Sequence, residues 1–250
     1  MSDFREENSN FYDLEYFISM EYRYLSGAHS SKVNNIFKLL GDIKNKKALD
    51  VGCGGGFLAN EMSKRGADVL GIDYSKYAID FSRERYPDLN FEQVSGYNLE
   101  MFPSNGFDIV TLFDVIEHVG DQGKFILEIK RVLKSGGLLV ITTDVEGGLW
   151  GKKNIVSFIR RTNYFSKAGR AYLFIKDVEK TRRKYKNYHA SHVSTLSYYD
   201  IENILNKNNF KIIKHSIYPL VAVPLRDFFL GFLPKRYRGD HQCAVAINKK

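Results

Sequence analysis

Between residues 47 and 144 the chain alternates short apolar runs with longer segments whose apolar residues recur three or four positions apart. A short apolar run is typical of a buried strand, and the longer spacing is typical of a helix with one buried face. Strands are predicted over 47–51, 68–73, 90–95, 107–114 and 138–144. Helices are predicted over 57–66, 75–87 and 120–137. This order predicts a parallel sheet with helices on both faces.

Glycine and serine residues mark the ends of these predicted helices. Gly66 closes the first, Ser75 can cap the second, and the pair Gly136–Gly137 is expected to end the third. The boundaries of the core elements are therefore supported by local chemistry as well as by periodicity.

Further elements are predicted on either side of this core. Aromatic residues at helical spacing predict a helix within 10–25, and a second helix begins at Ser30 and stops at Gly41. Towards the other end, Ser197 and Asp200 form an S-x-x-D capping box at the start of a helix. Two final strands are predicted over 210–218 and 241–249. We expect these two strands to form an antiparallel hairpin at the edge of the sheet.

Composition excludes several classes of protein. The chain has 250 residues, 44% of them hydrophobic, so it can bury a core without disulfides or metals. Its two cysteines, Cys53 and Cys243, lie in strand-like contexts, and neither a C-x-x-C spacing nor a cluster of acids suggests a metal site. The first ten residues are polar, and the most apolar segment, 217–233, is interrupted by prolines and charges. We therefore expect a cytoplasmic protein without a signal peptide or a membrane span.

Charge is concentrated in one segment. The formal net charge is +8, but residues 147–190 alone carry twelve Lys or Arg and two acidic residues. A second segment, 219–240, is apolar, aromatic and basic. The rest of the chain is close to neutral.

The strongest chemical signal is the stretch ALDVGCGGGF, residues 48–57, where a strand runs into closely spaced glycines. Such a turn brings the backbone close to a nucleotide, as in dinucleotide-binding dehydrogenases with G-x-G-x-x-G. Here Phe57 occupies the place of the third fingerprint glycine, and Asp50 precedes Gly52 by two residues. The resulting D-x-G-x-G-x-G pattern resembles motif I of the class I methyltransferases that use S-adenosylmethionine (SAM).

Two further stretches support this resemblance. Asp73 ends the second predicted strand, where it can accept both ribose hydroxyls, although NAD enzymes use the same device. The stretch FDIVTLFDVIEHV, from 107 to 119, resembles the signature of the methyltransferase type 11 group and of ubiquinone-biosynthesis O-methyltransferases. The resemblance covers about 46–143 together with the terminal helix and hairpin. It implies a Rossmann-like, seven-stranded and mostly parallel α/β sheet with an antiparallel terminal strand and an N-terminal helical cap.

The resemblance implies a set of cofactor contacts. Asp50 is expected to serve the ammonium group of the cofactor, directly or through water, and glycine amides its carboxylate. The group usually has Asp-Ala after the third strand, where this chain has Ser95-Gly96, so a weaker hydroxyl acceptor replaces a carboxylate. The predicted cofactor-binding residues are Asp50, Gly52, Cys53, Gly54, Asp73, Tyr74, Ser95, Gly96, Phe113 and Asp114.

Histidines are the default candidates for a general base in O-methyl transfer. His192 lies before the Ser197 helix, in a stretch that resembles the rim of the substrate pocket in the type 11 group, and a structural role is the alternative. His118 follows Glu117 after the fourth strand. There, capping of the next helix and shaping of the methionine pocket is the simpler interpretation than base catalysis. His29 and His189 are weaker candidates.

The basic segment has three interpretations. It can be a solvated lid over the active site, a surface for an anionic membrane, or a nucleic-acid site. Nucleic acid is the least supported, because the chain has no N-P-P-Y-type motif and no appended RNA-binding module. Together, 147–190 and 219–240 favour a peripheral place at the inner face of a membrane.

The sequence thus predicts one methyltransferase domain over 1–250. Its parts are a helical cap over 1–44, a SAM-binding core over 45–145, a basic insertion or lid over 146–192, and a terminal helix and hairpin over 193–250 with the insertion 219–240. The expected activity is O-methylation of a small or lipid-like acceptor, such as a quinone precursor, a lipid-linked or nucleotide sugar, or a secondary metabolite. The alternatives are a SAM-binding regulatory or scaffold module without catalysis, and an RNA methyltransferase.

Overall fold

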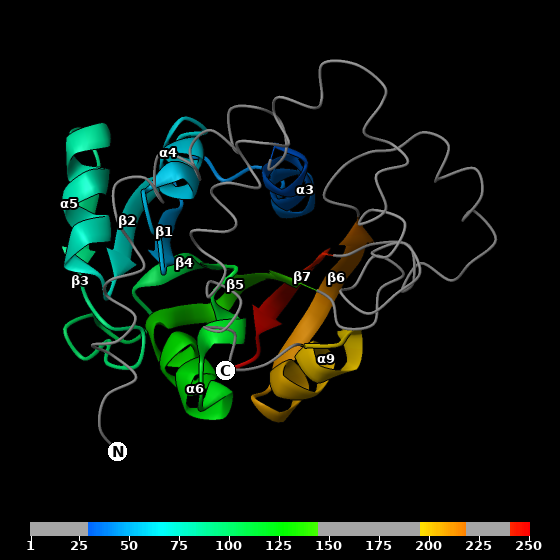
Figure 1. The fold of residues 1–250 in the computed structure, drawn as a ribbon. Coiled ribbons are helices and arrows are strands. Elements are labelled where there is room, and N and C mark those ends of the chain that lie inside the picture. The colour runs from blue at the N-terminus through cyan, green and yellow to red at the C-terminus, as the bar shows by residue number, and fades with distance from the viewer. Residues whose placement is uncertain (1–29, 145–195, 219–240) are drawn as a thin grey trace, which may run out of the picture.

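A computed structural model describes residues 30–144, 196–218 and 241–250 of the chain (Figure 1). Seven strands form one sheet in the order β3-β2-β1-β4-β5-β7-β6. The strands are β1 (Lys47–Val51), β2 (Asp68–Asp73), β3 (Asn90–Gln93), β4 (Phe107–Phe113), β5 (Leu133–Asp144), β6 (Phe210–Tyr218) and β7 (His241–Asn248). β1 to β5 are parallel, and β7 runs antiparallel to both β5 and β6. The predicted mixed sheet with an antiparallel terminal hairpin at its edge is confirmed.

Helices cover both faces of the sheet, as Figure 1 shows. α3, α4 and α5 lie on one face, and α6 and α9 lie on the other. Their bounds are α3 (Ser30–Leu40), α4 (Phe57–Ser63), α5 (Lys76–Arg85), α6 (Gln122–Val132) and α9 (Tyr198–Lys207), and a 3-10 turn, η2 (Ile116–His118), precedes α6. The described part of the chain is therefore a three-layer α/β/α sandwich.

The two faces of the central strands bury separate apolar clusters. Along β5, Leu139 and Ile141 pack in the cluster that includes α6 and α9, whereas Val140 packs in the cluster that includes α3, α4 and α5. Side chains alternate between the faces of a strand, so a strand covered on both sides needs apolar residues at every position. This is why these strands are visible in the sequence as continuous apolar runs.

The sheet has one topological switch point, between β1 and β4. β2 and β3 extend the sheet on one side of β1, and β4 and β5 extend it on the other. In an open α/β sheet, ligands bind in the crevice outside the carboxyl ends of the strands at such a point. The antiparallel β7 brings its first residue to the same edge, because His241 pairs with Asp144 at the end of β5.

The two predicted N-terminal helix caps are present. The Ser75 hydroxyl accepts a hydrogen bond from the backbone N–H of Ala78 at 3.2 Å. Ser197 and Asp200 form both reciprocal bonds of a capping box at the start of α9.

One predicted element was wrong in extent. The helix expected over 120–137 ends at Val132, and β5 begins at Leu133. Leu133 pairs with Phe107, and the register of β4 with β5 then shifts before Ile109 pairs with Leu138. Leu133 is buried, and Gly136 has a left-handed backbone with φ +73°. The Gly136–Gly137 pair that was expected to end the helix therefore belongs to the irregular first part of β5.

Several expectations lie outside the described residues. They are the helix over 10–25, the lid over 146–192 and the insertion 219–240. Among the described helices, none is long and apolar enough to cross a bilayer.

Candidate functional site at the carboxyl edge of the sheet

A glycine turn joins β1 to α4 at the switch point. Gly52 has φ +71°, and a methyl group added there would meet Val115 Cγ2 at 2.5 Å. Gly56 has φ +80° and caps α4, and a methyl group there would meet the Phe91 ring at 2.7 Å. Both the backbone conformation and the space therefore require glycine at these two positions.

Asp73 ties this turn to the end of β2. Its Oδ2 accepts a hydrogen bond from the backbone N–H of Gly54 at 3.0 Å, and its Oδ1 accepts one from Ser75 at 2.9 Å. Burial raises the pKa of Asp73, although these backbone donors act in the opposite direction. A carboxylate has about four lone-pair sites, so Asp73 can still accept hydroxyl donors. The structure places it beside the turn, as the sequence predicts, and its contact with a ribose stays a prediction.

Asp50 lies in the interior, just before the turn. It is 1% exposed, and its Oδ1 accepts a hydrogen bond from the Thr111 hydroxyl at 2.6 Å. Burial raises the pKa of Asp50 to about 7 against the effect of this hydroxyl, and the charge of Asp73 adds to the rise. Asp50 is thus held by Thr111 of β4 at the base of the turn, and its contact with the cofactor ammonium stays a prediction.

Ser95 and Gly96 follow β3 at the same edge. Gly96 leaves room for Phe125, because a methyl group there would lie 2.5 Å from the Phe125 ring. Tyr97 bridges to α6: its hydroxyl accepts hydrogen bonds from the backbone N–H groups of Gly120 at 2.9 Å and Asp121 at 3.3 Å. These packing contacts fix the loop that is expected to face the adenine.

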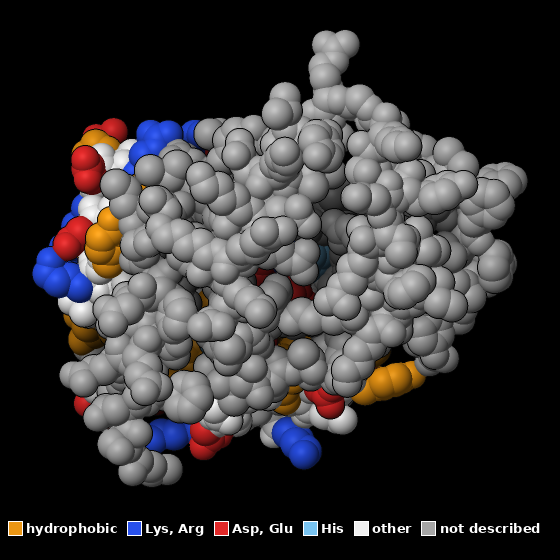
Figure 2. All heavy atoms as spheres, viewed as in Figure 1, with side chains coloured by type: hydrophobic (Ala, Val, Ile, Leu, Met, Phe, Trp, Pro, Cys, Tyr) orange, Lys and Arg blue, Asp and Glu red, His pale blue; other side chains and the backbone are white. Residues whose placement is uncertain are grey.

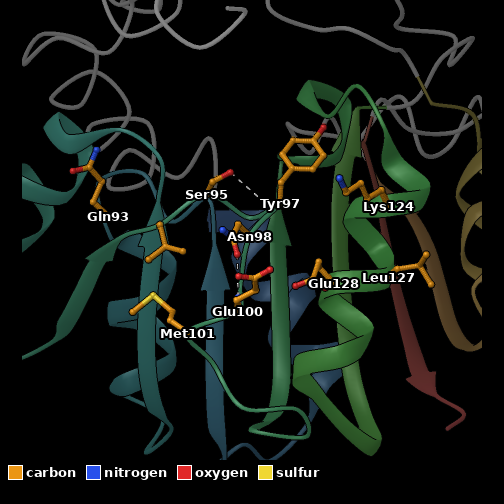
Figure 3. A pocket seen from close by; sticks show the side chains of 10 residues that line it. Gln93, Ser95, Tyr97, Asn98, Glu100, Met101, Lys124, Leu127 and Glu128 are labelled. Carbon is orange, nitrogen blue, oxygen red and sulfur yellow. Dashed lines mark hydrogen bonds between the residues drawn. The ribbon is translucent and has the colours of Figure 1, made fainter. Parts of the chain in front are cut away.

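A surface groove of about 950 Å³ runs from this loop along α6 (Figure 3). Of the predicted cofactor residues, Ser95 lines it, and most of the remaining lining comes from 97–101 and from the exposed side of α6. The groove is therefore a neighbour of the candidate site rather than the site itself.

A buried ion pair lies beyond β4. Lys32 of α3 is 1% exposed, and its Nζ lies 2.5 Å from Asp114 Oδ2 and 5.6 Å from the centre of the Phe113 ring. Asp114 has a left-handed backbone, with φ +55°, and its Oδ1 accepts a hydrogen bond from Thr142 Oγ1 at 2.9 Å. The pair joins α3 to the ends of β4 and β5.

The charges of this pair are mutually stabilised. Burial is the largest single effect and opposes the ammonium charge, but Asp114, Asp144 and Glu117 together outweigh it, and the pKa of Lys32 is raised. Burial is likewise the largest effect on the carboxylate, but Lys32 and His241 together outweigh it, and the pKa of Asp114 is lowered. Nearby, burial and the charge of Asp114 raise the pKa of Glu117 to about 8. The edge therefore holds a buried Lys32–Asp114 ion pair beside Glu117, a carboxyl group that burial makes harder to ionise.

The described residues fit SAM by their chemistry. Asp73 would accept the ribose hydroxyls, the Lys32–Asp114 pair suits an amino-acid end with both charges, and Tyr74 and Phe113 offer aromatic surface. Cys53 is buried, with its thiol 3.8 Å from the carbonyl oxygen of Gly54, so its side chain packs under the turn.

The predicted roles of two histidines have different outcomes. His118 lies on η2, and the N-cap of α6 is Asp121, whose side chain accepts from the backbone N–H of Lys124. The expectation that Glu117 and His118 cap the following helix was therefore wrong, because three residues intervene before α6. His192 lies outside the described residues.

Sequence reasoning missed two residues at this edge. Lys32 occupies the buried face of α3 one turn before Ile36, and a lysine in that apolar stripe was the available signal. His241 begins β7, and its Nδ1 lies 2.6 Å from Asp144 Oδ1. The antiparallel last strand was itself predicted, so the position of its first residue at the carboxyl edge could have been inferred. In the described ranges, no group of three or more His, Cys, Asp or Glu side chains is arranged to hold a metal.

Comparison with known proteins agrees with this geometry. The family model described as "Methyltransferase domain" matches residues 49–141. A ubiquinone biosynthesis O-methyltransferase from Acinetobacter baylyi is 35% identical over 128 residues, which cover 49% of this chain and 54% of that protein. The chain therefore spans about half the length of the curated relatives it matches.

Solved structures share the fold at low identity. The magnesium protoporphyrin IX methyltransferase of Synechocystis with bound SAM has a TM-score of 0.63 at 14% identity, over 100% of this chain and 99% of that one. The [4+2]-cyclase SpnF has a TM-score of 0.56 at 16% identity, over 86% and 84%. One fold thus serves proteins with different activities, so the fold alone does not decide the reaction.

Proposed function

We propose that this chain, whose residues 49–141 match the family model described as a methyltransferase domain, is a class I, SAM-dependent methyltransferase that transfers a methyl group to a hydroxyl oxygen of a small or lipid-like acceptor. The observation that carries the cofactor site is Asp73, held at the end of β2 by the backbone of the glycine turn, and the match of residues 49–141 to a methyltransferase domain favours SAM as that cofactor. A carboxylate fixed beside a nucleotide-binding turn selects a ligand with a free ribose diol.

Bound SAM supplies a methyl group already activated by its sulfonium. The protein therefore needs mainly to position the acceptor and to manage charge. Asp73 would fix the ribose, the loop at Ser95 and Gly96 would face the adenine, and Lys32 with Asp114 would hold the amino-acid end. A low-dielectric site strengthens each of these contacts.

Oxygen is favoured as the acceptor atom because the similar curated proteins are named ubiquinone biosynthesis O-methyltransferases. The aligned segment covers only part of each protein, so the identity of the acceptor is part of the proposal. Acceptors consistent with it are phenolic quinone precursors, lipid-linked or nucleotide sugars, and hydroxylated secondary metabolites.

Titration calorimetry with S-adenosylhomocysteine (SAH) on Asp73→Ala and Asp73→Asn tests the cofactor site. Each hydrogen bond to a charged acceptor contributes about 1.5–3 kcal/mol, so D73A should weaken SAH binding about 100-fold or more. D73N keeps one acceptor oxygen and should fall between D73A and wild type. Asp68→Ala, at the exposed start of the same strand, should bind like wild type. Full affinity in a folded D73A would contradict the placement of the ribose.

Two alternatives have distinct outcomes. Saturable SAM binding without transfer to any fraction of a cell extract would favour a regulatory or scaffold module. Transfer into RNA, with retention on RNA that weakens steeply with salt, would favour an RNA methyltransferase.

A further inference from the structure

The loop that follows β3 is bonded directly to the end of β2. Gln93 is the register partner of Asp73, and the backbone N–H of Val94 donates to the carbonyl oxygen of Asp73 at 3.0 Å. The side-chain amide of Gln93 also donates to the carbonyl oxygen of Tyr74 at 3.1 Å. Ser95 is the next residue along the loop, so it is fixed beside the carboxylate that is proposed to hold the ribose.

The strand order decides which end of a bound cofactor reaches Ser95. Asp73 ends β2, which lies between β1 and β3. The glycine turn follows β1, and the Lys32–Asp114 pair lies beyond it, at the end of β4. The ribose of SAM joins the amino-acid end to the adenine. With the amino-acid end over β1 and β4, the adenine therefore extends towards β3 and Ser95.

The Ser95 hydroxyl has hydrogen-bonding capacity to spare. Its oxygen accepts from the backbone N–H of Tyr97 at 3.4 Å, which is longer than the usual bond of this kind. A hydroxyl has two acceptor lone pairs and one donor hydrogen. Ser95 can therefore accept one hydrogen of the 6-amino group of adenine, and the second hydrogen on that nitrogen is left to point elsewhere.

The groove of about 950 Å³ begins at this residue. Figure 3 shows Ser95, Tyr97 and Lys124 at one end of it and Met101 further along. Two of its lining side chains are large, apolar and exposed: Met101 at 61% and Leu127 at 56%. Pockets of about 300–1,000 Å³ hold drug-sized ligands, so the groove has room for a ring.

The charges along the groove are mixed in sign. Lys124 of α6 and Glu100 of the loop both line it, and Glu128 is paired with Arg131 at 3.2 Å. In Figure 2, charged and apolar side chains are visible together along the lower rim, where Figure 1 places α6 and α9. A neutral group with apolar surface therefore suits the groove better than an ion does.

We propose that this groove is a subsite of the cofactor site, entered past Ser95, that admits an apolar substituent on the 6-amino nitrogen of the adenine. This rests on the proposed function, which takes SAM as the cofactor. The ligand class is SAM or SAH with an alkyl or benzyl group on that nitrogen. The nitrogen keeps one hydrogen, which Ser95 accepts, and the substituent lies between the loop and α6.

Titration calorimetry with SAH and with N6-benzyl-SAH tests the subsite without any acceptor. Wild type should bind the two ligands about equally, because the benzyl group enters space that is already open. A site that enclosed the 6-position would have to overpack to admit a benzyl group, at a loss of about 10- to 100-fold in affinity.

Tryptophan variants test whether the substituent lies in this groove. Lys124→Trp and Asn98→Trp should narrow it from its two walls and weaken N6-benzyl-SAH by about 10- to 100-fold, with SAH bound as in wild type. Lys124→Ala is the matched control and should bind both ligands like wild type. Thermal denaturation checks that each variant folds, and either tryptophan variant can decide if the other does not fold.

Ser95→Ala tests the point of entry. Loss of one hydrogen bond should weaken SAH binding by about 2- to 10-fold. The analogue of SAH with hydrogen at the 6-position should bind S95A and wild type alike, because it has no amino group to donate. Equal losses for both ligands would show that the hydroxyl does not meet the 6-position, and would overturn the inference.

The remaining outcomes separate this inference from the proposed function. If wild type binds SAH but loses about 10-fold or more on benzylation, the subsite is overturned and the proposed function stands. The same holds if neither tryptophan variant reduces binding of N6-benzyl-SAH. If wild type binds none of the three ligands, the proposed function is overturned, and this inference with it.

Discussion

Gly52 shows how one residue links sequence, packing and the candidate site. Its φ of +71° and the 2.5 Å approach to Val115 Cγ2 are two separate reasons for glycine. Gly136 is a matched control, because it has φ +73° and nothing within 4 Å. Substitution there isolates the cost of the backbone conformation from the cost of the clash.

We expect Gly136→Ala to lower the free energy of unfolding by about 1–2 kcal/mol, the cost of a left-handed backbone at a non-glycine residue. Gly52→Ala should cost about 1–3 kcal/mol more, because overpacking adds to the strain. Urea denaturation measures both. The double variant Gly52→Ala/Val115→Ala should recover part of the extra loss of stability that G52A shows over G136A. If G52A and G136A lose the same free energy of unfolding, the clash with Val115 is relieved without penalty.

Asp50 predicts a pH dependence of stability. Its pKa is raised to about 7 in the folded protein from an ordinary value near 3.8, so folding favours the protonated form. Its contribution is fully present below about pH 4 and is lost as the pH rises to about 7, by roughly 4 kcal/mol at 1.36 kcal/mol per unit.

Asp50→Asn removes this titration while keeping an acceptor for the Thr111 hydroxyl. Its stability relative to wild type should rise between pH 4 and 7 and then stay level, as measured by urea denaturation at closely spaced pH values. Asp68→Asn, an exposed carboxyl on β2, should follow wild type. A constant difference between D50N and wild type across this range would show that Asp50 is not protonated by burial.

At the scale of single residues, the sequence predicted those site residues that form a recognisable spacing within a short stretch of the chain. The glycines and Asp73 stand in a recognisable spacing, and the structure places them together at one edge. Lys32 lies 82 residues from its partner Asp114, and His241 lies 97 positions after Asp144. Spacing along the chain carries no information about such pairs, which exist only once α3 and β7 have docked on the sheet.

At the scale of elements, α9 depends on its capping box. The Ser197 hydroxyl accepts from the backbone of Asp200 at 3.3 Å, and the Asp200 carboxylate accepts from the backbone of Ser197 at 2.7 Å. We expect Ser197→Ala to destabilise the protein by about 1 kcal/mol, measured by thermal denaturation. Asp200→Asn should couple to it non-additively, because the two bonds form one motif. Ser104→Ala, in an exposed turn, should have little effect, and strict additivity of S197A and D200N would contradict the box.

Most elements could be predicted because each has its own periodicity and its own cap. The exception is the junction of α6 and β5, where a Lys-Ser-Gly-Gly segment that is a typical helix stop belongs to a strand. The Leu133–Phe107 pairing and the contact of Lys134 Nζ with Asp108 Oδ1 at 2.8 Å decide this boundary. Both are tertiary contacts, which local propensity does not contain.

At the scale of the molecule, the charge distribution predicts a partner. Residues 147–190 carry twelve Lys or Arg and only two acidic residues, and we propose that they and 219–240 rest on an anionic membrane surface. Affinity for anionic vesicles, measured by cosedimentation, should be weakened by salt and should fall by about 1,000-fold when Lys152, Lys153, Arg160 and Arg161 are neutralised, at about 1 kcal/mol for each charge. Neutral vesicles are the control. Unchanged binding in the neutralised variant would favour a lid over a soluble acceptor.

The measurement that tests the central claim most directly is the fate of the methyl group. The protein would be incubated with SAM carrying a deuterated methyl group and with hydroxyl acceptors, namely prenylated phenols, lipid-linked sugars and a cell extract. Mass spectrometry would locate the label. The account predicts SAH formation together with label on an acceptor oxygen in wild type, and a loss of about 100-fold in both for D73A at SAM concentrations below its Kd. Label on nitrogen, carbon or RNA, or SAM binding without any SAH formed, would contradict the account.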